Sequence, residues 1–233
     1  MSTKLGPIGR LMKMIHGPIY EARLRELVRR ITPHLREGDR ALDVGCGVGT
    51  LGVALMEGEQ APTGLIVEGL ERHRRGGEPI TVHSYQGGVM PFEDDAYDVV
   101  ILADVLHHAP EHDQLLAECA RVAKRLLIIK DHQRAGLLAW PRIALIDWAA
   151  NAPYGVSCLF RYHTPSEWSE IERRHGLEPI ERIERMRLYP FGWNLLFAGR
   201  LQRLCILEPH GAAGQNGAAT GPVSERNEAA AST

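Results

Sequence analysis

Residues 41–50 read Ala-Leu-Asp-Val-Gly-Cys-Gly-Val-Gly-Thr. The first four residues have the character of a short buried strand whose only acid is Asp43. A tight turn with three alternate glycines follows: Gly45, Gly47 and Gly49. A helix is predicted to begin at Thr50, so its unpaired N–H groups face the turn. Alternate glycines also let the backbone approach a bound molecule closely. This order of elements predicts a ligand held over the turn.

The acid beside the turn indicates the charge of that ligand. A turn built for a nucleotide diphosphate favours G-x-G-x-x-G and has no carboxylate next to the phosphates. Asp43 instead stands where a cationic ammonium group would be stabilised. The turn therefore favours a ligand with a positively charged end.

Apolar runs alternate with helical patterns on both sides of this turn. The predicted strands cover residues 40–44, 65–71, 79–85, 98–103 and 125–130, and the predicted helices cover residues 111–123, 137–150 and 165–175. Between the second and third strands, residues 72–78 leave little room for a helix. Two more apolar runs follow at residues 180–188 and 194–207. Alternating strands and helices predict a parallel sheet with right-handed crossovers.

Composition shifts divide the chain into three parts. Residues 1–36 are predicted to form a cap helix outside the sheet, with Pro18 at the helix start. Residues 37–208 form the main domain, with an insertion at about 135–165. Residues 209–233 are rich in Ala, Gly, Ser and Asn, and this composition is typical of a disordered tail.

The overall composition narrows the classes of partner and the compartment. With 27 Lys plus Arg against 29 Asp plus Glu, the net charge of −2 gives no domain-wide footprint for nucleic acid. The four cysteines form no C-x-x-C pair, so neither a disulfide framework nor a structural zinc site is expected. No signal peptide and no membrane span are expected, and a cytoplasmic location is predicted. The oligomeric state cannot be read from the sequence.

The pattern Asp43-x-Gly45-x-Gly47-x-Gly49 resembles the first motif of class I S-adenosylmethionine-dependent methyltransferases. The resemblance covers about residues 20–208 and weakens after residue 135. It implies an α/β fold: a doubly wound, mostly parallel, Rossmann-like seven-stranded sheet with helices on both faces and an antiparallel C-terminal strand. It also implies S-adenosyl-L-methionine as cofactor, with the methionine part in the glycine turn and its amino group held by the acid.

The resemblance extends to residues after the next two strands. Gly69-Leu70-Glu71 matches the segment whose acid accepts the ribose hydroxyls, although Glu68 remains an alternative. Residues 85–92 resemble the segment that meets the adenine, with Gln86 where an Asp is usual; the Gln carbonyl can still accept from an amine. The implied cofactor-binding residues are Asp43, Gly45, Cys46, Gly47, Gly49, Glu71, Gln86 and Gly87.

Candidate catalytic residues follow the fourth and fifth predicted strands. Ligands in open parallel sheets bind beyond the carboxyl ends of the strands. His108 and His132 are therefore candidate general bases. Asp131 is a candidate orienting or amine-binding group, as is Asp147. His107 is expected to point away from His108, because adjacent residues at a helical start point apart.

The insertion suggests how the acceptor is held. It is rich in aromatic side chains, which suit an acceptor pocket: Trp140, Trp148, Tyr154, Phe160 and Tyr162.

These observations predict methyl transfer to the oxygen or nitrogen of a small molecule, without a metal. The alternatives are an enzyme that keeps the cofactor as a scaffold for a non-methylating reaction, and an RNA methyltransferase. The chain has neither an appended basic domain nor the signature of amino-group methylation that the second alternative would favour.

Overall fold

The computed structural model describes residues 7–151, 158–184, 186, 188, 189, 192–197 and 199–209, with side chains from residue 17 onward. The helices are α1 (Pro7–Ile31), α2 (Thr50–Glu57), α3 (His112–Val122), α4 (Ala139–Asn151), α5 (Pro165–Arg174) and α6 (Trp193–Phe197). The strands are β1 (Arg40–Val44), β2 (Ile66–Glu71), β3 (Val82–Ser84), β4 (Tyr97–Ala103), β5 (Ala123–His132), β6 (Leu177–Ile183) and β7 (Gln202–Pro209). Short 3₁₀ turns are η1 (Thr32–His34), η2 (Leu106–His108) and η4 (Gly199–Leu201).

The strands form one seven-stranded sheet in the order β3-β2-β1-β4-β5-β7-β6. Strands β3, β2, β1, β4 and β5 pair in parallel, whereas β7 pairs antiparallel with both β5 and β6. β1 lies between β2 and β4, and Asp43 aligns with Gly69 on one side and Ile101 on the other. The predicted fold class is confirmed, including the antiparallel C-terminal strand.

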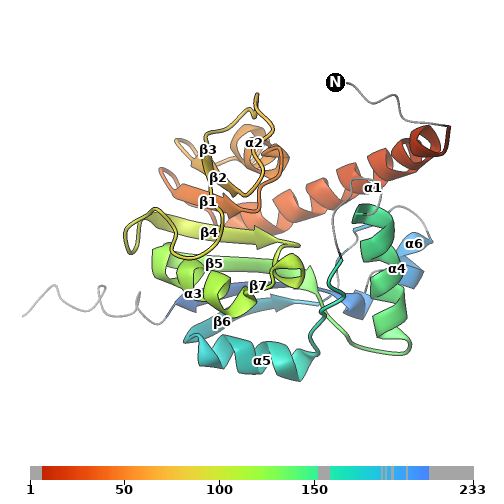
Figure 1. The fold of residues 1–233 in the computed structure, drawn as a ribbon. Coiled ribbons are helices and arrows are strands. Elements are labelled where there is room, and N and C mark those ends of the chain that lie inside the picture. The colour runs from red at the N-terminus through yellow and green to blue at the C-terminus, as the bar shows by residue number, and fades with distance from the viewer. Residues whose placement is uncertain are drawn as a thin grey trace, which may run out of the picture.

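Helices cover both faces of the sheet (Figure 1). One core contains apolar residues of α3 and α5, such as Leu116 and Trp168, packed against the sheet. The other core contains apolar residues of α1 and α2, such as Ile31 and Leu55. Both faces of β1 and β4 are therefore buried, which explains why these strands are continuous apolar runs in the sequence.

α4 and α6 lie beyond the carboxyl ends of the parallel strands (Figure 1). α4 belongs to the insertion between β5 and α5 and contacts α6. Ligands bind at this edge of open parallel sheets. The insertion is thus placed where it can border a site at the ends of β4 and β5.

Several observed boundaries differ from the predicted ones: the N-terminal helix ends at Ile31, β3 is shorter than predicted and β5 is longer. Pro18 lies inside α1 rather than at its start, so that prediction is wrong. An interior proline removes one helical hydrogen bond and its ring clashes with the carbonyl of residue i−4, so α1 continues through Pro18 at a local cost. Pro209 belongs to β7 and pairs with Leu177, one residue into the predicted tail. Residues 210–233 of that tail lie outside the described residues.

Candidate active site

The glycine turn joins β1 to α2 and uses backbone conformations that suit glycine. Gly45, Gly47 and Gly49 have φ angles of 71°, 59° and 79°. A Cβ on Gly45 would lie 2.6 Å from a Val105 side-chain carbon, and a Cβ on Gly49 would lie 2.7 Å from Ile80. A Cβ on Gly47 would meet no described protein atom within 4 Å. Gly45 and Gly49 are thus required by packing, whereas Gly47 faces space that a ligand can fill.

Two carboxylates flank the turn. Asp43 is buried, and Glu71 at the end of β2 accepts a hydrogen bond from the Gly47 N–H at 2.9 Å. Burial, with a contribution from the negative charge of Glu71, raises the pKa of Asp43 to about 7. Burial likewise raises the pKa of the neighbouring Cys46 thiol to about 12, so this cysteine stays protonated.

Glu68, the alternative to Glu71, has other partners. Its carboxylate accepts a hydrogen bond from the Tyr97 hydroxyl at 2.6 Å and lies 3.3 Å from Arg40 Nη2. The structure therefore brings Glu71, and not Glu68, to the glycine turn.

The segment predicted to meet the adenine follows β3. Gln86 is exposed and donates from Nε2 to the Arg72 carbonyl oxygen at 2.9 Å. Gly87 has a φ angle of 102°. The contact of Gln86 with Arg72 connects this segment to the residue after Glu71.

An ion cluster near the turn was not predicted from the sequence. Arg23 of α1 forms an ion pair with Asp104, which follows β4 and has a φ angle of 59°. The Lys130 ammonium contacts both Asp104 oxygens, at 2.5 and 2.6 Å. Burial would raise the pKa of Asp104, but Arg23 and Lys130 hold it below its usual value. The charge of Arg23 also lowers the pKa of Asp43.

His107 is the centre of a buried polar network at the ends of β4 and β5. It donates from Nδ1 to Asp131 Oδ1 at 2.6 Å, and its Nε2 lies 3.6 Å from Asp147 Oδ1. Burial alone would lower the pKa of His107, but the two carboxylates raise it to about 10. His107 is therefore an imidazolium at neutral pH and cannot accept another proton.

Asp147 connects this network to the insertion. Tyr162 donates its hydroxyl to Asp147 Oδ2 at 2.6 Å, and Asn151 donates from Nδ2 to Oδ1 at 2.8 Å. Burial would raise the pKa of Asp147, but hydrogen bonds from His107 and Tyr162 lower it to about 2. Asp147 is thus a fixed negative charge.

His108 approaches the same carboxylate from the more open side. Its Nε2 lies 3.5 Å from Asp147 Oδ1, and 22% of its side chain is exposed, against 3% for His107. The two rings are 4.1 Å apart between centroids, so the prediction that His107 and His108 point apart is wrong. Both lie in the 3₁₀ turn η2, and both rings are drawn toward the same Asp147 oxygen, at 3.6 Å from His107 Nε2 and 3.5 Å from His108 Nε2.

His132 lies deeper than the sequence suggested. It is 6% exposed, and its Nδ1 lies 3.0 Å from Gln202 Nε2. Burial lowers the pKa of His132 to about 3. The ring is therefore neutral at ordinary pH and has little tendency to take a proton.

Two groups of described side chains bring potential metal donors within 4.8 Å of one another: Asp104, His107 and His132, and His107, His108 and Asp147. Both groups include His107, which its neighbouring carboxylates keep protonated. A metal bound through His107 would have to displace this proton. We assign no metal to either group, and the prediction of a metal-free site stays a prediction.

The aromatic residues of the insertion have mixed positions. Tyr162 is buried on Asp147, whereas Trp140, Trp148 and Phe160 are 46%, 54% and 38% exposed. Tyr154 lies outside the described residues. Only Tyr162 among the described aromatic residues of this set joins the polar network.

Comparison with known proteins identifies the family. The methyltransferase-domain family matches residues 18–182. The chain belongs to this family. The predicted class, a class I S-adenosylmethionine-dependent methyltransferase, is thereby confirmed together with its cofactor.

Curated relatives of this methyltransferase include the ubiquinone biosynthesis O-methyltransferases of Ralstonia nicotianae and Cereibacter sphaeroides. The chain is 28% identical to the Ralstonia protein over 162 residues, which cover 62% of this chain and 65% of that protein. It is 25% identical to the Cereibacter protein over 174 residues, 70% of each chain. The chain therefore spans about two thirds of the length of these relatives.

Several solved structures share the fold. An Aquifex aeolicus S-adenosylmethionine-dependent methyltransferase gives a TM-score of 0.53 at 18% identity, covering 88% of this chain and 100% of that chain. Synechocystis magnesium protoporphyrin IX methyltransferase, solved with S-adenosylmethionine, gives 0.53 at 17% identity, with coverage of 89% and 86%. The [4+2]-cyclase SpnF gives 0.55 at 18% identity, covering 80% of each chain.

Proposed function

We propose that this methyltransferase transfers the methyl group of S-adenosylmethionine to a hydroxyl oxygen of a small-molecule acceptor. The observation that carries the proposal is the His108–Asp147 pair at the carboxyl ends of β4 and β5. It combines a part-exposed imidazole with a fixed negative charge at 3.5 Å. The naming of the curated relatives as O-methyltransferases supports oxygen, rather than nitrogen, as the acceptor atom.

The residues around the glycine turn fit the cofactor. Gly47 leaves open space at a position that a Cβ would fill. Asp43, once ionised, suits the cofactor's ammonium group, and Arg23 suits its carboxylate. Glu71 suits the ribose hydroxyls, and Gln86 with Gly87 borders the expected adenine position. When bound, S-adenosylmethionine supplies an electrophilic methyl group.

Proton removal is the task we assign to His108. The imidazole of His108 takes the proton of the acceptor hydroxyl as the acceptor oxygen receives the methyl group, and its Nε2 side faces Asp147. Asp147 then stabilises the resulting imidazolium. Tyr162 and Asn151 hold Asp147 in place through hydrogen bonds of 2.6 and 2.8 Å. His107 is already protonated and His132 resists protonation, so His108 is better suited to this role than either neighbour.

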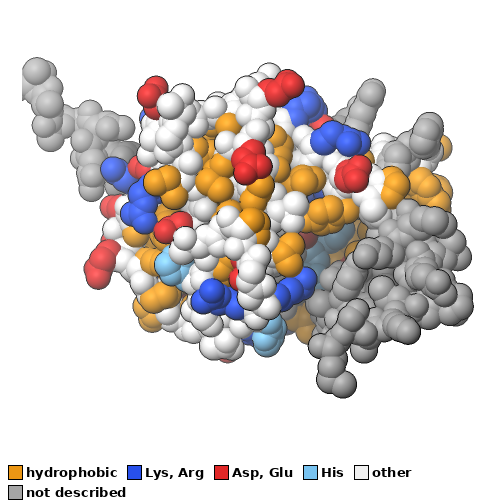
Figure 2. Space-filling model, turned by 90° about the horizontal axis from the view of Figure 1, so that it is seen from above, with side chains coloured by type: hydrophobic (Ala, Val, Ile, Leu, Met, Phe, Trp, Pro, Cys, Tyr) orange, Lys and Arg blue, Asp and Glu red, His pale blue; other side chains and the backbone are white. Residues whose placement is uncertain are grey.

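A small-molecule acceptor agrees with the distribution of charge. Figure 2 shows cationic and anionic side chains interspersed with apolar ones on the face seen from above, rather than a basic stripe.

Among the described helices, none has the length and apolar character that crossing a bilayer requires. The four cysteines are free thiols, which supports the inference that the protein works in the reducing cytoplasm.

Methyl-labelled S-adenosylmethionine tests the proposed function. The protein is incubated with the labelled cofactor, a metal chelator and cell extract fractionated by size. We expect label in a low-mass fraction, in a product whose fragmentation shows an O-methyl group. Label in RNA or protein, an N-methyl product, or a chelator-sensitive reaction would each contradict a part of the proposal.

The pH dependence of cofactor binding tests the role of Asp43. Because its pKa is about 7, the carboxyl group is mostly neutral at pH 6 and mostly ionised at pH 7.5. We expect affinity for S-adenosylhomocysteine to rise roughly tenfold across this range, measured by calorimetry. Asp43→Asn should bind weakly with no such rise, because the amide does not ionise.

Glu71 and Glu68 provide a matched pair for the same titration. Glu71→Gln removes the like charge beside Asp43, so the rise in affinity should move to lower pH, and the ribose contacts should be lost. Glu68→Gln should leave both the affinity and the pH dependence unchanged, because Glu68 contacts Tyr97 and Arg40 instead. The opposite result would reverse the assignment of the ribose ligand.

A further inference from the structure

A cavity of about 250 Å³ lies between α5 and the strands β6 and β7, at the other end of the sheet from the glycine turn. β7, which lines it, is three strands from β1, or roughly 14 Å at the usual strand spacing. The residues that line the cavity are Gln133, Pro165, Trp168, Ser169, Arg182, Ile183, Glu184, Arg203 and Leu204. The residues proposed above for the cofactor and for methyl transfer are not among them.

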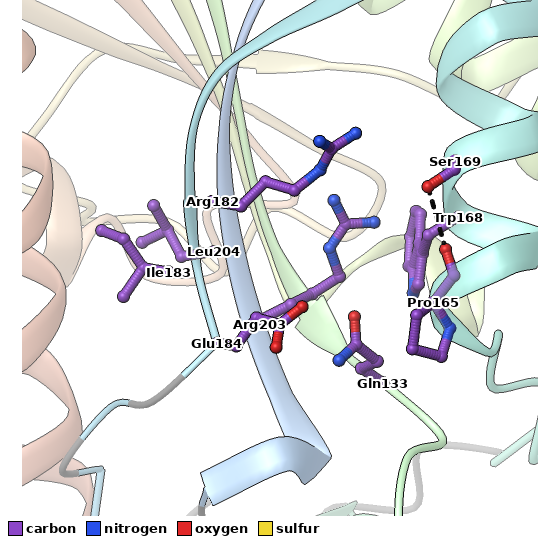
Figure 3. A pocket seen from close by; sticks show the side chains of 9 residues that line it. All are labelled: Gln133, Pro165, Trp168, Ser169, Arg182, Ile183, Glu184, Arg203 and Leu204. Atoms are coloured by element: carbon purple, nitrogen blue, oxygen red, sulfur yellow. Dashed lines mark hydrogen bonds between the residues drawn. The ribbon is translucent and has the colours of Figure 1, made fainter.

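Two buried donor groups in the cavity wall have atoms without a hydrogen-bond partner among the described residues. Arg203 is 4% exposed and its Nη1 has no acceptor; Gln133 is 3% exposed and its Nε2 has none. Figure 3 shows both side chains, with Arg182, directed into the space beside Trp168. Buried N–H groups are nearly always paired with protein, water or a ligand. These atoms therefore indicate an acceptor that enters the cavity.

The orientation of the Arg203 guanidinium is fixed by its surroundings. Nη2 donates to Glu172, and the guanidinium lies 4.4 Å from the centre of the Trp168 ring. Arg182 donates to the other Glu172 oxygen at 2.7 Å. Glu172 thus balances one of the two positive charges and leaves Nη1 of Arg203 available. A pre-oriented guanidinium edge matches a planar carboxylate.

The other lining residues limit the size and charge of the ligand. The charges of Arg182 and Arg203 are offset by Glu172 and by the exposed Glu184, so the cavity has no formal charge surplus and disfavours a dianion such as phosphate. The unpaired N–H edge of Arg203, rather than a net charge, is what suits a single carboxylate. The volume is several times the roughly 30 Å³ that one water occupies. Trp168, Ile183 and Leu204 supply apolar contacts for the rest of the molecule.

We propose that this cavity binds a small monocarboxylate with an apolar body through Arg203 and Gln133. The site is adjacent to the histidine network, because Gln133 follows His132 and Trp168 donates from Nε1 to the His132 carbonyl oxygen at 3.1 Å. The proposal does not depend on the acceptor proposed above, since it concerns binding at a separate cavity.

Benzoate and its neutral counterpart benzamide test the proposal by calorimetry on the full chain. We expect benzoate to bind at concentrations below about 10 mM, and benzamide and inorganic phosphate to bind at least tenfold more weakly. S-adenosylhomocysteine at saturation should not displace benzoate. Equal binding of benzoate and benzamide, no binding of benzoate, or displacement by S-adenosylhomocysteine would overturn the proposal.

Variants locate the bound benzoate. Gln133→Leu removes the amide donor at similar size, and we expect it to weaken benzoate binding about tenfold. Arg203→Lys should weaken it further, and if this variant does not fold, Gln133→Leu decides. Glu184→Gln, the matched control, should retain or strengthen binding because it removes a negative charge. Wild-type affinity in Gln133→Leu would place benzoate elsewhere.

Discussion

Replacing His108 with alanine is expected to lower kcat by roughly 10² to 10⁴-fold and to leave the affinity for S-adenosylmethionine unchanged. The reason is that His108 is the part-exposed imidazole at the ends of the strands, and its Nε2 lies 3.5 Å from the ionised Asp147. The measurement is steady-state turnover with the acceptor isolated by labelling, together with calorimetry for the cofactor. The acidic limb of the pH–rate profile should disappear with the imidazole.

His34→Ala is the matched control for this variant. His34 has nearly the same side-chain exposure, 21% against 22%. It lies in η1, which precedes β1 in the chain, whereas His108 follows the carboxyl end of β4. Replacing His34 should leave turnover within a few-fold of the wild type. If both variants are equally active, His108 is not the base and methyl transfer proceeds by proximity and desolvation.

Asp147→Asn separates positioning from proton transfer. The amide keeps most of the shape of Asp147 but removes the negative charge beside His108. The protonated form of the imidazole is then less favoured, so the acidic limb of the pH–rate profile should move to lower pH. A purely structural role of Asp147 would lower the amount of active protein without moving this limb.

The part of the site that was predictable from sequence depends on local patterns. Asp43 and Gly47 could be placed because the strand, the glycine turn and the helix start are adjacent in the chain. Glu71 could be placed because an acid at the end of a parallel neighbour of β1 must lie near the same turn. The register that aligns Asp43 with Gly69 brings Glu71 to the Gly47 N–H.

The histidine network was only partly predictable, because it depends on contacts between distant segments. The order of the strands placed His107, His108 and Asp131 at one edge. It did not show that Asp147, from the insertion, reaches both histidines. Nor did it show that His132 is buried against Gln202, 70 residues away. Sequence spacing gives no signal for such contacts.

The ion cluster of Arg23, Asp104 and Lys130 was likewise not predictable from sequence spacing. Arg23 reaches Asp104 across 81 residues, and its helical spacing alone would place it equally well on a solvated face. Only the packing of α1 against the sheet shows that Arg23 pairs with Asp104. The left-handed conformation of Asp104, stabilised by Arg23 and Lys130, likewise has no local sequence signal.

Replacing Asp131 with asparagine is expected to destabilise the protein by about 3 to 5 kcal/mol near neutral pH, because it leaves a buried imidazolium with one of its two carboxylate partners. Asp131 is 1% exposed and accepts hydrogen bonds from His107 Nδ1 and from the His132 N–H, both at 2.6 Å. Urea unfolding of the wild type and the variant measures the difference. Asp113→Asn is the control: its carboxylate is 48% exposed, so its ion pairs with Arg174 and His175 should contribute less than about 1 kcal/mol.

The sign of the pH dependence identifies His107 as the source of the effect. Its pKa in the folded protein is about 10, above the value of about 6.5 in an unfolded chain. The proton on His107 therefore stabilises the fold fully below about pH 6.5, and this contribution is lost as the pH rises through about 10. The destabilisation by Asp131→Asn should accordingly be largest near pH 6.5 and shrink toward pH 10. A loss that stayed constant over this range would mean that Asp131 acts through packing, or through its bond to the His132 N–H, and not through the charge of His107.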